Sequence, residues 1–325
     1  MEEIVFQQRT DLSQLNNAVA AIRETVGKVI KGQHRMVDLI IAGLLSDGHI
    51  LIEGVPGVAK TLTAKIIARI IDADFSRLQF TPDLMPSDVL GTSVFNPKEV
   101  RFDFKKGPIF SNIVLIDEIN RSPAKTQAAL FEVMEERQVT VDGITYPMAP
   151  PFMVLATQNP VDQEGTYRLP EAQLDRFIFK IEVGYPTVEE EIAILNDQHN
   201  KSQQTMLNDI PRIMTTAAIA QYRETVLQLV VEPRLLEFIA KVVNETRNNP
   251  SLYLGASPRA SLAIVRAAKA FAAIRGRDFV TPEDIIEVVP HVLRHRIILT
   301  PEKEMEGMTP DDLIQKIIKS VEIPR

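Results

Sequence analysis

Five short apolar runs alternate with helical patterns in the first 186 residues of this chain. The runs cover residues 49–53, 75–80, 113–116, 152–157 and 177–183. Apolar runs of this length, separated by helices, are typical of strands that are buried on both faces of a parallel sheet. The pattern therefore predicts an α/β fold for this part of the chain.

From about residue 186 onward the pattern is helical, and we expect no further strand. Apolar residues recur at helical spacing over residues 189–198, 234–248, 257–275 and 282–293. We therefore predict two domains: an α/β domain over residues 1–186 and an all-helical domain over residues 187–325.

Hydroxyl side chains mark three expected helix starts. Ser13 is the expected cap of an N-terminal amphipathic helix within residues 11–26, and a second helix is expected over residues 35–46. Ser257 and Thr281 are each followed by a proline, which suits the first turn of a helix. We expect helices to begin at both.

Composition and charge argue against several functions. The 325 residues include no cysteine and five histidines without ligand spacing, so disulfides and structural zinc are not expected. The net charge of −7 argues against a surface built for nucleic acid, although it does not exclude a local basic patch. Neither a signal peptide nor an apolar stretch long enough to span a bilayer is evident. We expect a cytoplasmic protein without membrane insertion.

Two insertions interrupt the α/β pattern. In residues 81–110, apolar segments on either side of Asn96-Pro97 are expected to pair. In residues 137–150, Asp142-Gly143 lies between β-forming residues, which predicts a hairpin because both turn positions favour positive φ. Surface decoration is the alternative interpretation of both insertions.

A glycine-containing loop joins the first predicted strand to the following helix, with the sequence Gly54-Val-Pro-Gly-Val-Ala-Lys60-Thr61. In this setting, backbone N–H groups and the helix N-terminus can hold phosphates, and the Lys60 ammonium can reach the β- and γ-phosphates. The Thr61 hydroxyl would complete Mg²⁺ coordination. The loop predicts binding of ATP with Mg²⁺.

Two residues depart from the usual phosphate loop. Pro56 supplies no N–H group, so its neighbours must hold the phosphates. Ala59 stands where glycine is expected, which is tolerable if its φ is negative and otherwise costs about 1 kcal/mol. The sign of φ at Ala59 therefore decides whether the loop is strained.

Two carboxylates follow the apolar run at residues 113–116. We expect Asp117 and Glu118 at the carboxyl end of this strand, where open α/β sheets bind ligands. Asp117 suits Mg²⁺ coordination, mostly through water, and Glu118 suits polarisation of an attacking water molecule as a base. A helix cap gives the same pattern, so the pair indicates hydrolysis mainly because it accompanies the phosphate loop.

Three further side chains are candidates for phosphate chemistry. Asn159 follows the run at 152–157 and can hydrogen-bond both the water and the γ-phosphate, although an Asn-Pro turn is the simpler interpretation of these residues. Arg176 and Arg259 can stabilise charge on a phosphoryl group in the transition state. An isolated arginine is more commonly a solvated or salt-bridged group.

Together, these segments resemble the AAA+ ATPases and most closely the MoxR family. The supporting segments are residues 53–61, 115–121, 156–160 and 169–177, and the similarity extends over nearly the whole chain. The resemblance implies a P-loop three-layer αβα domain with a five-stranded parallel sheet in the order 5-1-4-3-2, followed by a small helical lid. It also implies that the insertions are the helix-2 insert and the pre-sensor-1 hairpin, which line or flank a central pore.

The resemblance assigns catalytic roles to individual residues. Asp117 and Glu118 match the Walker B pair, Asn159 matches sensor 1 and Arg259 matches sensor 2. Arg176 matches the arginine finger, which acts on the nucleotide of a neighbouring subunit. The alternative finger, if the register differs, is Arg168.

The resemblance also implies which residues contact the nucleotide. Gly32 and Gln33 lie in a segment similar to the one that lies against adenine. The remaining contacts come from the Walker A segment and the residue after it: Gly54, Val55, Pro56, Gly57, Val58, Ala59, Lys60, Thr61 and Leu62.

For the whole protein, the resemblance implies a homohexameric ring that couples ATP hydrolysis to remodelling or maturation of a protein partner. MoxR relatives commonly work with von Willebrand factor A domain proteins. Two alternatives stay open: a motor stimulated by nucleic acid, whose relatives share the two insertions, and a nucleotide-gated scaffold with little turnover.

Overall fold

The computed structural model describes residues 10–55, 57–159, 169–200 and 210–324, and the chain divides into two compact units. Of the described residues, those within 21–220 form the sheet unit, and those within 10–20 and 221–324 form the helical unit. The last strand of the main sheet ends at Val183, just before the domain boundary that the sequence predicts. The structural division between the two units lies further along the chain, within helix α9 (Thr216–Leu227). The two domain ranges expected from the sequence stay a prediction.

The main sheet has five parallel strands in the spatial order β2-β5-β8-β1-β9. In chain order this is 5-1-4-3-2, so the predicted fold is confirmed, and each apolar run forms one strand. The strands are β1 (His49–Gly54), β2 (Phe75–Gln79), β5 (Ile113–Asp117), β8 (Met153–Gln158) and β9 (Phe177–Val183).

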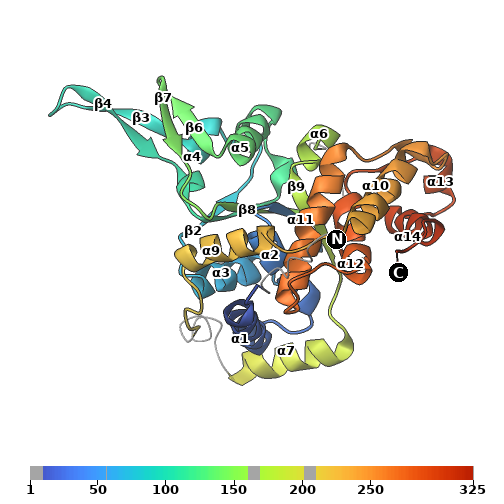
Figure 1. Ribbon diagram of the computed structural model, residues 1–325. Helices are drawn as coiled ribbons and strands as arrows, with labels where there is room; N and C mark the ends of the chain where they lie inside the picture. The colour runs from blue at the N-terminus through green and yellow to red at the C-terminus, as the bar shows by residue number, and fades with distance from the viewer. Residues whose placement is uncertain (1–9, 56, 160–168, 201–209, 325) are drawn as a thin grey trace, which may run out of the picture. The chain divides into compact units, whose positions relative to one another are not determined.

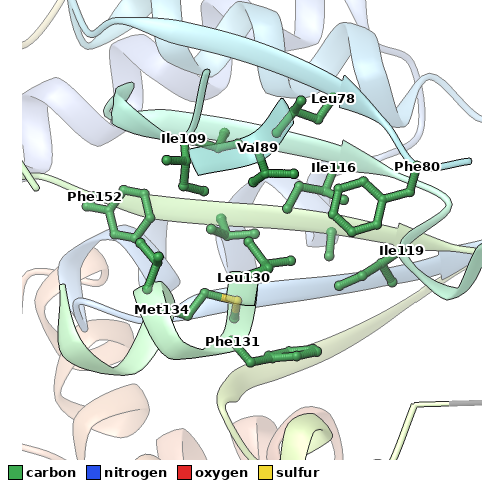
Figure 2. Close-up of a cluster of buried hydrophobic side chains, with 14 of the residues drawn as sticks. Leu78, Phe80, Val89, Ile109, Ile116, Ile119, Leu130, Phe131, Met134 and Phe152 are labelled. Carbon is green, nitrogen blue, oxygen red and sulfur yellow. The ribbon is translucent and has the colours of Figure 1, made fainter. Parts of the chain in front are cut away.

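Helices pack on both faces of this sheet, which explains why its strands are apolar without alternation. Helices α2 (His34–Leu45) and α3 (Lys60–Ile70) contact the sheet on one face (Figure 1). Helix α5 (Ala124–Glu136) covers the other face, where Leu130 and Phe131 share a buried cluster with Ile116 (Figure 2). Because α3 begins directly after the loop that follows β1, packing of α3 also fixes the position of that loop.

Both insertions contain hairpins, as predicted. Helix α4 (Pro86–Leu90) precedes the first hairpin, and Asp142 and Gly143 form the turn of the second, with φ values of 52° and 76°. Side chains of the two hairpins meet, because the Ser93 hydroxyl donates a hydrogen bond to the Asp142 carboxylate. Their strands are β3 (Gly91–Asn96) and β4 (Arg101–Lys106), then β6 (Gln138–Val141) and β7 (Ile144–Pro147).

The helical unit confirms the helix starts after Ser257 and Thr281, where a proline occupies the first turn. Its main helices are α10 (Pro233–Asn248), α11 (Pro258–Ile274), α12 (Pro282–Leu293), α13 (Pro301–Met305) and α14 (Pro310–Ser320). Further helices in the described residues are α1 (Ser13–Val29), α6 (Glu171–Leu174), α7 (Val188–Asn200) and the short 3₁₀ helices η1 (Pro108–Phe110) and η2 (Ile119–Arg121). Among the helices that the structure describes, none is long and apolar enough to cross a membrane.

Two local expectations were wrong. Strands do occur after residue 186: β10 (Leu252–Leu254) pairs antiparallel with β11 (Ile298–Leu299). Strands this short do not show the alternation of apolar and polar residues by which a strand is predicted from sequence. Ser13 is not the helix cap but the first helical residue, and its N–H donates to the Asp11 carboxylate at 2.9 Å. Asp11 therefore satisfies an amide at this helix start.

Candidate functional site

Parallel strands bring the predicted phosphate loop, the acid pair and Asn159 to one edge of the sheet. Strand β8 lies between β5 and β1, and Ile52 of β1 lies beside Thr157 of β8 in the ladder. Parallel strands end at the same edge, and ligands of open α/β sheets bind there. The structure thus brings these residues together, while their individual roles stay predictions.

The phosphate loop needs glycine at two positions for different reasons. A Cβ on Gly54 would lie 2.6 Å from the carbonyl oxygen of Val183, so the end of β1 fits against β9 only without a side chain. Gly57 has a φ of +89° and open space where a Cβ would point. Of the other loop residues, Val58 is buried and Val55 is half-buried, as is Leu62 in α3; Pro56 lies outside the described residues.

The Lys60 side chain turns back into the loop. Its Nζ donates a hydrogen bond to the Gly54 carbonyl oxygen at 2.6 Å. Burial lowers the pKa of Lys60, and the negative charges of Asp117, Glu118 and Glu53 oppose that shift. Both predicted acids therefore act electrostatically on the Lys60 ammonium.

Ala59 adopts the left-handed conformation, with φ 59° and ψ 19°, directly before α3 begins. The Thr63 hydroxyl and N–H both donate to its carbonyl oxygen, at 3.0 and 2.9 Å, which holds the residue in place. An alanine here would be free of strain only if its φ were negative, and the φ of Ala59 is positive. The loop accepts a cost of about 1 kcal/mol at this position.

We expect Ala59→Gly to leave the free energy of unfolding unchanged within about 0.5 kcal/mol, because relief of strain offsets the greater backbone entropy that glycine loses on folding. Ala64→Gly, in the interior of α3, is the control and should lower it by at least about 1 kcal/mol. Urea unfolding of both variants provides the measurement. Equal losses at the two positions would show that Ala59 is not strained.

Asp117 ends strand β5 and is buried, with 8% of its surface exposed. Its Oδ1 accepts a hydrogen bond from the Thr157 hydroxyl at 3.2 Å. Its Oδ2 accepts from Nε of Arg77 at 2.7 Å, in a salt bridge from the neighbouring strand β2. Both carboxylate oxygens therefore have a fixed partner in the protein.

Glu118 follows with a left-handed backbone, φ 57° and ψ 52°. Its N–H donates to the Thr157 hydroxyl at 3.1 Å. Its Oε2 accepts from the Gln79 amide at 3.0 Å and lies 3.1 Å from Nε of Arg121. Backbone conformations of this kind are uncommon outside glycine and often occur at functional sites. The Glu118 carboxylate is held by two side chains of its own chain.

Arg176 lies between α6 and β9 and turns toward α5 of its own chain. Its guanidinium donates a hydrogen bond to the Phe131 carbonyl oxygen and lies 3.7 Å from the Glu135 carboxylate. A finger that acts on a neighbouring subunit would have to leave these partners. The alternative finger, Arg168, lies outside the described residues.

Gly32 and Gln33 connect α1 to α2, and Gly32 has a φ of +73°. The carboxylate of Glu190 occupies the space beside Gly32, since a Cβ there would lie 2.2 Å from its Cδ. The same carboxylate accepts a hydrogen bond from the Thr187 N–H at 2.9 Å. The segment predicted to contact adenine is therefore packed against the first turn of α7.

Arg259 belongs to the helical unit and is exposed in the first turn of α11. The preceding loop is fixed by the Thr246 hydroxyl, which accepts from the Ala256 N–H at 3.0 Å. A Cβ on Gly255 would lie 2.5 Å from the Thr246 carbonyl oxygen, so the loop passes directly over α10. These contacts define the position of Arg259 within its own unit.

Thr61 and Asp117 fit the chemistry of Mg²⁺. Hydroxyl and carboxylate oxygens are ligands that this ion prefers, and it commonly takes one or two carboxylates together with phosphate oxygens and water. Asp117 is buried at the strand end, and Thr61 is half-buried in the first turn of α3. These two residues are the candidates to hold the ion.

Four residues at this edge were missed by the sequence interpretation: Arg77, Gln79, Arg121 and Thr157. Arg77 and Gln79 are two residues apart in a strand, which places them on one face of the sheet, and this spacing was the available signal. Their pairing with the acids depends on the register between β2 and β5, in which Gln79 lies beside Asp117. The register between two strands that lie about 40 residues apart in the chain cannot be read from the local sequence pattern.

The chain is similar to known proteins in both sequence and structure. Residues 49–179 match the family model "ATPase family associated with various cellular activities (AAA)", and residues 244–317 match "AAA lid domain". Chaperone MoxR1 of Mycobacterium tuberculosis is 45% identical, covering 92% of this chain and 81% of its own length. Protein MoxR of Methylorubrum extorquens is 28% identical, and the match covers 96% of this chain and 97% of that protein. A solved structure of a Cytophaga hutchinsonii protein superposes on this chain with a TM-score of 0.88 at 43% identity, and the match covers 96% of this chain and 97% of that chain.

The fold and the loop after β1 define a P-loop protein of the αβα class with a helical lid domain. The chain belongs to the MoxR family of AAA+ ATPases. Nucleotide binding is expected for this family, and its curated members include a chaperone.

Proposed function

We propose that this protein hydrolyses ATP to ADP and phosphate with Mg²⁺, and that hydrolysis drives remodelling or maturation of a protein partner. The observation that supports this most directly is the shared environment of Lys60, Asp117 and Glu118, in which a phosphate-binding cation and two carboxylates meet at the sheet edge. Phosphoryl transfer depends mainly on positioning and on compensation of charge, and this arrangement can supply both.

Each residue has a defined task in this proposal. The loop amides and Lys60 bind the phosphates, and Gly32 and Gln33 contact the base. Thr61 and Asp117 would hold Mg²⁺, which supplies charge neutralisation at the β- and γ-phosphates when bound. Asn159 orients the γ-phosphate and the attacking water.

Glu118 acts as the base that accepts a proton from the water. To bind that water, the Glu118 carboxylate must give up its contact with Gln79 or with Arg121. The left-handed backbone at Glu118 and its bond to Thr157 keep the main chain in place during this exchange. Only the side chain has to move.

We further propose that the active form is a homohexameric ring in which Arg176 completes the site of the neighbouring subunit, assisted by Arg259 of the lid. Arginine fingers contribute about 10³–10⁵ in rate in other ATPases and GTPases, so turnover should rise with assembly. A von Willebrand factor A domain protein is the candidate client.

Mixing Arg176→Ala with Glu118→Gln subunits tests action between subunits. Each variant alone should be nearly inactive, whereas a 1:1 mixture should regain about a quarter of the parent activity, because that share of random neighbours pairs an intact Glu118 with an intact Arg176. Phosphate release under assembling conditions is the readout. If the two variants assemble but the mixture regains no ATPase activity, the proposal fails. Arg176 then acts only within its own chain, through its hydrogen bond to the Phe131 carbonyl oxygen.

A further inference from the structure

Arg77 forms a salt bridge with the acid proposed to hold the metal ion. The residue lies on β2, the edge strand beside β5, and its side chain is 49% exposed, whereas that of Asp117 is 11% exposed. The Nε–Oδ2 distance of 2.7 Å is that of a charge-assisted hydrogen bond. The guanidinium is thus the hydrated member of the pair and the carboxylate the buried one, so Arg77 is the partner that can leave. The pair lies at the proposed metal ligand, where departure of Arg77 would free a carboxylate oxygen.

The second acid of the site has the same kind of partner. Glu118 lies 3.1 Å from Nε of Arg121, and Asp117 lies 2.7 Å from Nε of Arg77. With Lys60, three cationic side chains lie near these two carboxylates, and Glu53, the third acid near Lys60, is paired with Lys180 at 3.0 Å. A divalent cation arriving alone is repelled by this arrangement, whereas an anionic metal–nucleotide complex is attracted.

We propose that Arg77 makes metal binding at Asp117 depend on nucleotide. Its guanidinium satisfies the carboxylate until a nucleotide brings the metal ion, and Oδ2 then exchanges the guanidinium for the ion or its water. Arg77 is thus a positioning residue, and its exposure allows the side chain to move into solvent at little cost. The identification of the ligand as Mg²⁺–ATP rests on the proposed function.

The arrangement around Asp117 favours this exchange. The backbone of Asp117 is fixed, because its carbonyl oxygen accepts from the Phe80 N–H at 2.9 Å. The Thr157 hydroxyl holds Oδ1, so the carboxylate keeps its orientation when Oδ2 changes partner. Only Arg77 has to leave, and it does so from an exposed strand edge.

Binding of Mn²⁺ to the full chain without nucleotide, measured by electron paramagnetic resonance, tests the inference. Arg77→Gln should raise the affinity for Mn²⁺ about tenfold over the parent, because a neighbouring positive charge is removed and Oδ2 is released. Arg77→Lys, which keeps the charge, should remain close to the parent. Addition of Asp117→Asn to Arg77→Gln should abolish the gain, which would locate the ion at Asp117.

Arg101→Gln is the matched control, because Nε of Arg101 also binds an aspartate, Asp103, at 2.8 Å on an exposed hairpin. It should leave Mn²⁺ affinity unchanged. Arg77→Met gives a second neutral variant if Arg77→Gln does not fold. An unchanged affinity in a folded neutral Arg77 variant, or a gain that survives Asp117→Asn, overturns the inference.

Binding of a fluorescent ATP analogue with Mg²⁺ separates this result from the proposed function. If the parent does not bind the analogue, the proposed function fails, while the Mn²⁺ titration still decides whether Arg77 controls the carboxylate. If the parent binds it and the Arg77 variants show no change in Mn²⁺ affinity without nucleotide, only the inference about Arg77 fails.

Discussion

Replacing Glu118 with glutamine is expected to slow steady-state phosphate release by about 10²–10⁴-fold, because an amide cannot accept the proton of the attacking water. The fold should persist, since Gln79 can still donate to the amide oxygen of the new side chain and the bond from the residue's N–H to Thr157 involves only the backbone. ATP binding should be retained, because Lys60 and the loop are untouched.

Glu132→Gln is the control for this variant, because Glu132 is exposed on α5 of the same unit. It should release phosphate at the parent rate. Equal rates of phosphate release by Glu118→Gln and the parent would show that Glu118 has no catalytic role. Negligible release by an assembled parent would instead favour a nucleotide-gated scaffold.

Replacing Asp284 with alanine is expected to destabilise the helical unit by about 2–4 kcal/mol, because it removes the charge-assisted hydrogen bonds of a fully buried carboxylate and the cap of α12. Asp284 is fully buried, and its carboxylate accepts from Arg277 at 2.6 and 2.8 Å and from Arg275 at 2.9 Å. It also accepts from the Thr281 N–H at 3.0 Å and so caps α12.

Asp312 offers a matched control for the cap alone. It accepts from the Thr309 N–H at 3.0 Å in the same motif at the start of α14, but it is exposed. Asp312→Ala should therefore cost only about 1 kcal/mol. Denaturant unfolding monitored by circular dichroism measures both variants. Similar losses would mean that the two arginines of the Asp284 network contribute nothing beyond the cap.

Elements whose signals are local were predicted well. The hairpin at Asp142-Gly143 follows from two adjacent residues that accept positive φ, and α12 begins after Thr281 because a hydroxyl and a proline stand side by side. The strand order, by contrast, came from the MoxR resemblance, because apolar runs give strand positions but not their neighbours.

The phosphate loop and the acid pair were therefore determined by the sequence itself, since each is a short string at the end of an apolar strand. Only the tertiary structure decided how they are held. The left-handed φ of Ala59 depends on the path between β1 and α3. The partners of Asp117 and Glu118 come from β2 and β8, about 40 residues away along the chain, and from Arg121. Register between strands sets which side chains meet, and register arises from packing of the whole sheet rather than from any local segment.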